Sequence, residues 1–149
     1  MLTPWYVTGF CDGEAAFTYS RAGGSFNIYF LIKQSQDNRQ IVEDIQEFFG
    51  YVGTIYHEVP NPSFDKRGLT KPSAHYRVNR IGELKTITDH FDKYPLQSKK
   101  KNAAYLVWRQ MVLYKLDHYR HIDYETLREM AVRLSSLNIQ SRLFKVHKR

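Results

Sequence analysis

Two runs of alternating apolar and polar residues, joined by Gly23-Gly24, restrict this chain to folds that contain an antiparallel sheet. Residues 15–22 (AAFTYSRA) and 25–34 (SFNIYFLIKQ) are typical of strands, and a Gly-Gly pair between such runs is typical of a hairpin turn. Side chains on a strand alternate between the two faces of the sheet. In the second run one face therefore collects the apolar residues Phe26, Ile28, Phe30 and Ile32. This face needs helices to cover it.

The rest of the pattern supplies those helices and a second hairpin. Helices are predicted over about residues 4–12, 35–50, 81–94, 98–118 and 123–138, with Asp37 capping the second of them. Strands are predicted at 53–59 and 73–80, with a long loop between them, and a basic tail covers about 141–149. This order predicts a single α+β domain over residues 1–149 with one antiparallel sheet.

Charge narrows the kind of partner that such a domain binds. The chain has 22 Lys and Arg residues against 15 Asp and Glu, which favours a polyanion such as nucleic acid. Cys11 is the single cysteine, so an internal disulfide and a cysteine-based zinc site are excluded. No apolar run approaches ~18 residues, and the start of the chain is not typical of a targeting segment. We expect no membrane association.

The polar face of the predicted sheet combines hydrogen-bond donors, acceptors and flat rings. Such side chains can read base edges in the major groove, which admits a β-ribbon, although an ordinary solvated face is the alternative. The expected DNA contacts are Thr18, Ser20, Arg21, Asn27, Tyr29, Leu31, Lys33, Thr54, Tyr56, Glu58, His75, Arg77 and Asn79. The long loop adds Lys66, Arg67 and Lys71, whose charges suit phosphate contacts.

Asp12 and Glu14 stand at the end of the first predicted helix, split by Gly13. Partial negative charge at a helix C-terminus disfavours a carboxylate there, by up to ~1 kcal/mol. One interpretation is a pair of exposed acids that the fold tolerates. The other is a divalent cation that cancels both repulsions, and Mg²⁺ suits carboxylates together with waters and phosphate oxygens. Such an ion would polarise a phosphodiester and prepare a water nucleophile.

Residues 5–17 (WYVTGFCDGEAAF) resemble the LAGLIDADG motif of homing endonucleases. The match covers Trp5, Gly9, Phe10, Asp12, Gly13, Glu14 and Phe17, and departs from the pattern at Ala15, where glycine is usual. The predicted order of elements also resembles the family's αββαββα core, whose antiparallel sheet forms a DNA-binding saddle. The helices after that core are extra C-terminal helices.

The resemblance implies roles for individual residues. Glu14 is expected to hold a catalytic Mg²⁺, with Mn²⁺ or Ca²⁺ able to occupy the same sites. Gly13 and Asp12 are the other expected metal contacts, and Asp12 is expected to be mainly structural, helping to close the helix end. A polar residue at the end of the second strand orders water in this family, which points to Gln34, with Gln36 as the alternative. A lysine near the scissile phosphate is expected at Lys99, with Lys100 and Lys101 as alternatives.

The resemblance also implies assembly and activity. Single-motif members are homodimers, so the first helix is expected to meet its copy through Trp5, Thr8, Gly9, Cys11 and Asp12. The expected function is a metal-dependent double-strand break in a long, near-palindromic DNA target. The alternatives are a splicing cofactor (maturase) for the host intron RNA, a non-cleaving DNA-binding protein, or a transcription regulator that reuses the fold. A mitochondrial, chloroplast or bacterial cytoplasmic location stays open.

Overall fold

Five helices and four strands make up the described part of the chain. The computed structural model describes residues 1–61, 63 and 71–146, with side chains up to residue 138. In chain order the elements are α1 (Pro4–Glu14), β1 (Ala15–Ala22), β2 (Ser25–Ser35), a short 3₁₀ turn (Gln36–Asn38), α2 (Arg39–Phe48), β3 (Thr54–Glu58), β4 (Ser73–Val78), α3 (Ile81–Lys93), α4 (Lys99–Asp117) and α5 (Tyr124–Val146). None of the described helices is apolar over a stretch long enough to cross a membrane.

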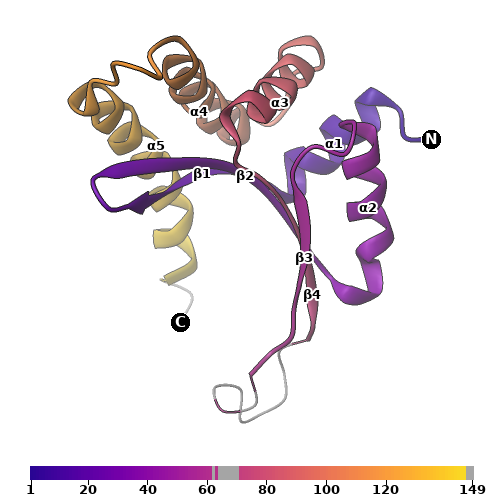
Figure 1. Cartoon of the computed structure of the whole chain (residues 1–149). Coiled ribbons are helices and arrows are strands. Elements are labelled where there is room, and N and C mark those ends of the chain that lie inside the picture. The colour runs from indigo at the N-terminus through magenta and orange to yellow at the C-terminus, as the bar shows by residue number, and fades with distance from the viewer. Residues whose placement is uncertain (62, 64–70, 147–149) are drawn as a thin grey trace.

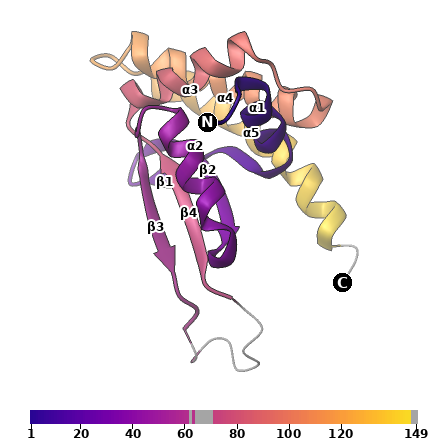
Figure 2. The same cartoon turned by 90° about the vertical axis from the view of Figure 1, so that its right-hand side faces the viewer.

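The strands form one antiparallel sheet in the order β1-β2-β4-β3, which confirms the predicted α+β class. The sheet arches, with α1 to α4 on its convex side and an open concave face opposite (Figure 1). Seen from the side of α1 and α2, α2 lies along β2 and β4 (Figure 2). The predicted alternation therefore works as expected, because one face of the sheet is covered and the other is open.

An aromatic cluster joins the sheet to the helices above it. The Phe17 ring lies 5.2–5.5 Å from the rings of Phe30, Phe91, Tyr105 and Trp108, mostly edge to face. All five side chains are at most 3% exposed. Edge-to-face pairs add to the hydrophobic gain of burial, so these rings fix α3 and α4 against the first hairpin.

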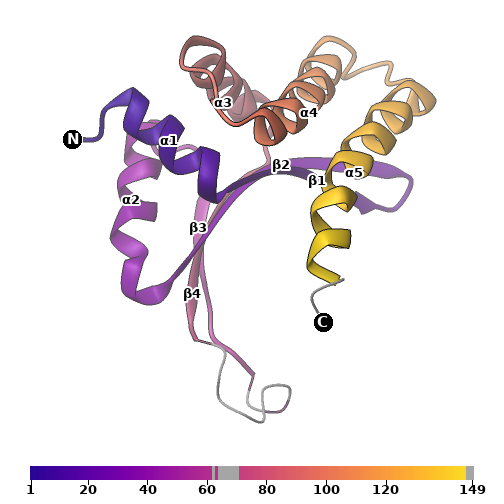
Figure 3. The same ribbon diagram turned by 180° about the vertical axis from the view of Figure 1, so that it is seen from behind.

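Helix α4 also holds the first hairpin through polar contacts. Trp108 Nε1 donates to the carbonyl oxygens of both Thr18 (3.1 Å) and Tyr29 (3.0 Å), which are paired residues of β1 and β2. Lys115 Nζ donates to the Phe26 carbonyl at 2.5 Å. At the outer edge of β1, the Tyr19 hydroxyl contacts Ser135 Oγ of α5 at 2.5 Å, where α5 runs past the hairpin (Figure 3).

Two local predictions were wrong. Asp37 does not cap α2, because a 3₁₀ turn spans residues 36–38 and Asn38 takes the N-cap position without a side-chain hydrogen bond. Gln36 N donates instead to the Pro72 carbonyl at 2.9 Å. This hydrogen bond ties the 3₁₀ turn to the residue before β4, and α2 begins only at Arg39. The predicted tail at 141–149 is helical up to Val146, since no glycine or proline interrupts the sequence after Asn138.

Helix α1 is anchored by a buried hydrogen-bonded group. Thr8 Oγ1 donates to the Tyr94 carbonyl (2.8 Å) and lies 3.0 Å from His90 Nε2, so the imidazole N–H is the donor in the second contact. The His90 ring packs edge to face against Phe48, Phe49 and Phe91. Burial lowers the pKa of His90 to about 4, because the charged ring loses its water there.

Stability should therefore fall on mild acidification. The pKa of His90 is about 6.5 in the unfolded chain and about 4 in the folded one, so between these pH values only the unfolded chain binds a proton there. The stability that depends on neutral His90 is therefore complete above about pH 6.5 and is lost as the pH falls toward 4. His90 alone should lower the free energy of unfolding by about 2 kcal/mol between pH 7.5 and pH 5. Urea unfolding at the two pH values measures this loss. A His90→Gln variant with the same pH dependence as the wild type would contradict it.

Candidate active site

The end of α1 runs directly into β1, which fixes the position of the acidic pair. α1 ends at Glu14 and β1 begins at Ala15, with no loop between them. Ala15 pairs with Ile32, so Gln34, two residues further along β2, lies beside the last turn of α1. Gly13 and Glu14 are exposed there, while Asp12 is half-buried.

Glu14 is held by a chain of side-chain amides. Gln34 Nε2 donates to Glu14 Oε2 at 3.1 Å and to the Lys33 carbonyl at 3.0 Å. Asn38 Nδ2 donates to Gln34 Oε1 at 2.9 Å, which turns the N–H₂ end of the Gln34 amide toward the carboxylate. The sequence predicted Gln34 at this place but missed Asn38, whose only signal is its spacing of four residues from Gln34.

Of the three predicted lysines, the structure brings Lys101 to the acids and leaves the preferred Lys99 outside. Lys101 Nζ donates to the Ala15 carbonyl at 2.5 Å. Its burial lowers the pKa of Lys101, and the negative charges of Asp12 and Glu14 partly offset that effect. Lys99 and Lys100 instead line a shallow pocket with Ala103 and Leu137. Two steps along a helix rotate a side chain by about 200°, so Lys99 and Lys101 cannot face the same way.

Asp12 binds the start of another helix. Its Oδ2 accepts the backbone N–H groups of Gln97 (3.0 Å) and Ser98 (2.9 Å), and Ser98 is the N-cap of α4. Burial would raise the pKa of Asp12, but the hydrogen bonds from Ser98 and Gln97, with the charge of Lys101, outweigh it and hold that pKa below its ordinary value. Asp12 Oδ1 is shielded from solvent and has no hydrogen-bond partner in the described part of the chain. This geometry favours the expected structural role of Asp12 over a role as a metal ligand. The helix end that Asp12 closes is the start of α4.

A divalent cation would find oxygen ligands at the end of α1, but too few in one chain. In the part of the chain that the structure describes, no three His, Cys, Asp or Glu side chains gather into a metal site. Glu14 offers an exposed carboxylate, and the last carbonyls of a helix, including that of Gly13, lack partners within it. These ligands suit Mg²⁺, which completes its shell with water and phosphate oxygens.

The strand register places most of the predicted DNA contacts on the open face. Paired residues lie on the same face, and the pairs are Thr18 with Tyr29, Ser20 with Asn27, Leu31 with Arg77 and Thr54, and Lys33 with His75 and Tyr56. Lys71 and Asn79 are exposed beside β4, and Lys66 and Arg67 lie outside the described residues. Contact of these side chains with DNA stays a prediction.

Arg21 differs from the other predicted contacts. It pairs with Phe26 on the helix-covered side, and its guanidinium lies over the Phe26 ring, 5.9 Å from the centroid. The period of two puts Arg21 in phase with Phe17, so Arg21 lies apart from the open-face residues, and its contact with DNA stays a prediction.

His75 and Glu58 are engaged with each other on the open face. His75 is 6% exposed, its Nε2 lies 3.0 Å from Glu58 Oε2 and 2.9 Å from Ser73 Oγ, and Tyr56 stacks on its ring at 4.7 Å. Burial lowers the pKa of His75, and the Glu58 charge only partly offsets this. The His75 imidazole and the Glu58 carboxylate therefore have fewer hydrogen-bonding positions left for another partner than the sequence alone suggests.

One face of α1 is free for a partner, and it differs in part from the predicted one. Trp5 and Tyr6 are 53% and 51% exposed, and Gly9 and Gly13 are exposed on the following turns. Thr8 and Cys11 were predicted to meet a partner, which is wrong because both are buried inside the protomer. The predicted interface residue Asp12 is likewise bonded to α4, so only Trp5 and Gly9 of the predicted set lie on the free face.

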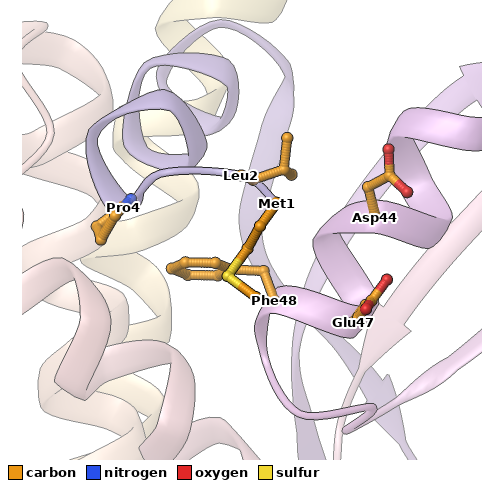
Figure 4. A pocket seen from close by; sticks show the side chains of 6 residues that line it. All are labelled: Met1, Leu2, Pro4, Asp44, Glu47 and Phe48. Atoms are coloured by element: carbon orange, nitrogen blue, oxygen red, sulfur yellow. The ribbon is translucent and has the colours of Figure 1, made fainter.

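A cavity of about 620 Å³ lies near the other end of α1, between the N-terminal residues and α2 (Figure 4). It is lined by Met1, Leu2, Pro4, Asp44, Glu47 and Phe48. Since α1 rises ~1.5 Å per residue, this cavity is about 15 Å from Glu14 and does not form part of the same site.

Comparison with known proteins agrees with this geometry. The family model for LAGLIDADG endonucleases matches residues 7–112, well over half of the chain. An uncharacterized 50.9 kDa protein in ND4 intron 1 of Podospora anserina is 31% identical over 121 residues, which cover 75% of this chain and 24% of that protein. A probable intron-encoded endonuclease of Neurospora crassa is 27% identical over 145 residues, covering 92% of this chain and 29% of the relative.

Solved structures show the same fold. The LAGLIDADG meganuclease I-AabMI bound to uncleaved DNA is 26% identical, with a TM-score of 0.75 over 93% of this chain and 45% of that one. I-SmaMI, solved on uncleaved DNA in the presence of calcium ions, is 24% identical, with a TM-score of 0.70 over 90% of this chain and 44% of that one. The chain thus spans about a quarter of these curated relatives and less than half of these two endonucleases.

Removing the Asp12 carboxylate should destabilise the protein. An Asp12→Ala variant leaves two N–H groups at the start of α4 without their acceptor, and losing such a cap costs about 0.5–2 kcal/mol. Chemical denaturation of the wild type and the variant measures the difference. Asp12→Asn keeps one acceptor oxygen and should lose less. An alanine variant that unfolds at the same denaturant concentration as the wild type would show that the cap is not needed.

Proposed function

The chain belongs to the LAGLIDADG endonuclease family, and from this premise we propose that it is a homing endonuclease that makes a site-specific double-strand break in DNA as a homodimer. The observation that carries the proposal is the exposed Glu14 carboxylate, fixed by Gln34 at the point where α1 meets the sheet. The fold shared with DNA-bound I-AabMI supports the open sheet face as the DNA-binding surface.

Glu14 and the side chains around it have separate roles in phosphodiester hydrolysis. Mg²⁺ bound at Glu14 would supply a water of lowered pKa and polarise the scissile phosphate. Gln34 orients the carboxylate through its N–H₂ group and is placed to order a water beside it. Lys101, held at the Ala15 carbonyl, brings positive charge to the end of α1, where negative charge develops in the transition state.

A second copy of the chain would complete the site. One protomer offers a single free carboxylate, and the exposed face of α1 carries Gly9 and Gly13, at which another backbone can approach closely. A two-fold axis along this face pairs identical surfaces and brings the two Glu14 residues together. Doubling the charge of +7 gives +14 (2 × 7), so DNA binding should weaken steeply with salt.

Assistance to splicing of the host intron RNA is the second candidate, because both relatives are named after introns. Their intron locations also support an organelle-encoded gene over a bacterial one. Incubation with precursor intron RNA tests this role separately from cleavage of intron-less DNA.

Replacing Glu14 by glutamine should abolish cleavage and leave binding intact. Substrate is first selected from a randomised near-palindromic duplex library in Mg²⁺. The Glu14→Gln variant should then cut it more than about 1,000-fold more slowly, because metal stabilisation is worth several kcal/mol. Glu47→Gln, an exposed charge change on α2, is the matched control and should cut normally. Wild-type cleavage by Glu14→Gln, with unchanged thermal unfolding and DNA binding, would reject the proposed site.

A bulky residue at Gly9 should prevent dimerisation. Apart from α1's own backbone and the two neighbouring residues, no described atom lies within 4 Å of a Cβ added at Gly9, so Gly9→Leu should fold but keep two α1 helices apart. Helix pairs pack at ~8–10 Å, and a leucine at the contact widens that distance. Analytical ultracentrifugation should show a monomer, and double-strand cleavage should be lost. Gly82→Leu on α3, which is equally unobstructed, should remain a dimer. A dimeric Gly9→Leu protein would place the interface elsewhere.

A further inference from the structure

We propose that Arg77 reads a guanine through the DNA major groove, with the Tyr29 ring holding its guanidinium in the reading position. The inference rests on the proposed function, because it assumes that the open sheet face lies on DNA. It names one residue that sets which base is accepted at one position of each half-site.

The geometry places Arg77 at the middle of that face. β4 is an inner strand, and Arg77 sits in register between Leu31 of β2 and Thr54 of β3. Its guanidinium carbon lies 3.9 Å from the centroid of the Tyr29 ring, a close cation–π stack. Tyr29 is on the neighbouring strand β2, and its own carbonyl is fixed by Trp108. The stack therefore rests on an anchored residue.

The guanidinium has unused hydrogen-bonding capacity. Arg77 Nε is shielded from solvent and has no hydrogen-bond partner among the residues that the structure describes. Among the described residues no carboxylate forms an ion pair with Arg77, and Glu58, the acid predicted on this face, pairs with His75 at 3.0 Å. A buried donor without an acceptor is costly, and such groups are rare unless a function needs them. Arg77 is half-buried, and no described residue accepts a hydrogen bond from its terminal N–H groups, so an external acceptor can reach these groups even though Nε is shielded.

The shape of the side chain and its position select a guanine edge. Guanine presents O6 and N7 side by side in the major groove, and the planar fork of arginine matches them with two parallel hydrogen bonds. Phosphates run along the rims of the groove, nearer the edges of a docked sheet, whereas Arg77 is on an inner strand. The stack on Tyr29 also restricts the side chain before binding, which reduces the entropy lost on contact.

The test uses DNA binding in Ca²⁺, so that cleavage does not enter. Selection from a randomised duplex library with the wild-type protein should return one invariant guanine per half-site that depends on Arg77. Replacing that guanine by 7-deazaguanine removes only the N7 acceptor and should weaken wild-type binding about 10- to 150-fold, the range of one hydrogen bond to a charged group. The same replacement should have no effect on Arg77→Gln, because the contact is already lost.

Matched variants separate this role from general effects. Tyr29→Phe keeps the ring and should keep the guanine preference, whereas Tyr29→Leu removes the stack and should relax it. Arg128→Gln, at an exposed position of α5 outside the sheet, should leave the preference unchanged. If Arg77→Gln is poorly folded, 7-deazaguanine with the wild-type protein still decides whether N7 of the invariant guanine is contacted.

Three results would overturn the inference. Arg77→Gln could weaken binding uniformly for all bases and reduce the salt slope by about one, which would make Arg77 a phosphate contact. It could leave affinity and preference unchanged. The selected site could also lack a guanine that depends on Arg77. Each of these spares the proposed function, which fails separately if the wild-type protein selects no DNA site at all.

Discussion

The hydrogen bonds from the Gln97 and Ser98 backbone to Asp12 determine how α1 and α4 meet at the site. They join the end of α1 to the start of α4, and Lys101, in the first turn of α4, donates in turn to the Ala15 carbonyl. A carboxylate near the C-terminus of its own helix is thereby placed at the N-terminus of another, where the partial charge is positive. The first acid of the motif is stabilised by the fold itself.

The second acid, Glu14, is not placed at the N-terminus of another helix, so the two acids of the motif have different roles. Glu14 receives one hydrogen bond from the Gln34 amide and remains exposed at the negative end of α1. A rigid, solvent-facing carboxylate in this position gains more from a cation than from any neighbour in the protomer. Because the described residues of one protomer bring only the Glu14 carboxylate to this position, the same argument that favours a metal also favours a second copy of the chain across the exposed face of α1.

What could be predicted from the sequence was what depends on near neighbours in the chain. The hairpin at Gly23-Gly24, the strand alternation and the helix predicted over about 98–118 follow from local patterns in the sequence, and all three were confirmed. Gln34 was placed correctly because it continues a strand whose register the hairpin fixes. The direction of α1 could not be predicted in the same way, because small residues occur on both of its sides.

The wrong predictions about the site involve contacts between distant residues. Thr8 is buried by Tyr94, 86 residues away, so no local pattern shows that it points inward. The choice of Lys101 over Lys99 depends on how α4 is rotated, and Asp12 sets that rotation from 86 residues away through Ser98. Tyr29 shows the same dependence on distant contacts within the sheet. Trp108 fixes its backbone from the core while its ring supports Arg77 on the open side. The core thus determines how accurately the open face presents the Arg77 side chain. On the proposed DNA target, a core substitution such as Trp108→Phe would act on recognition through Tyr29 without touching the nucleic acid.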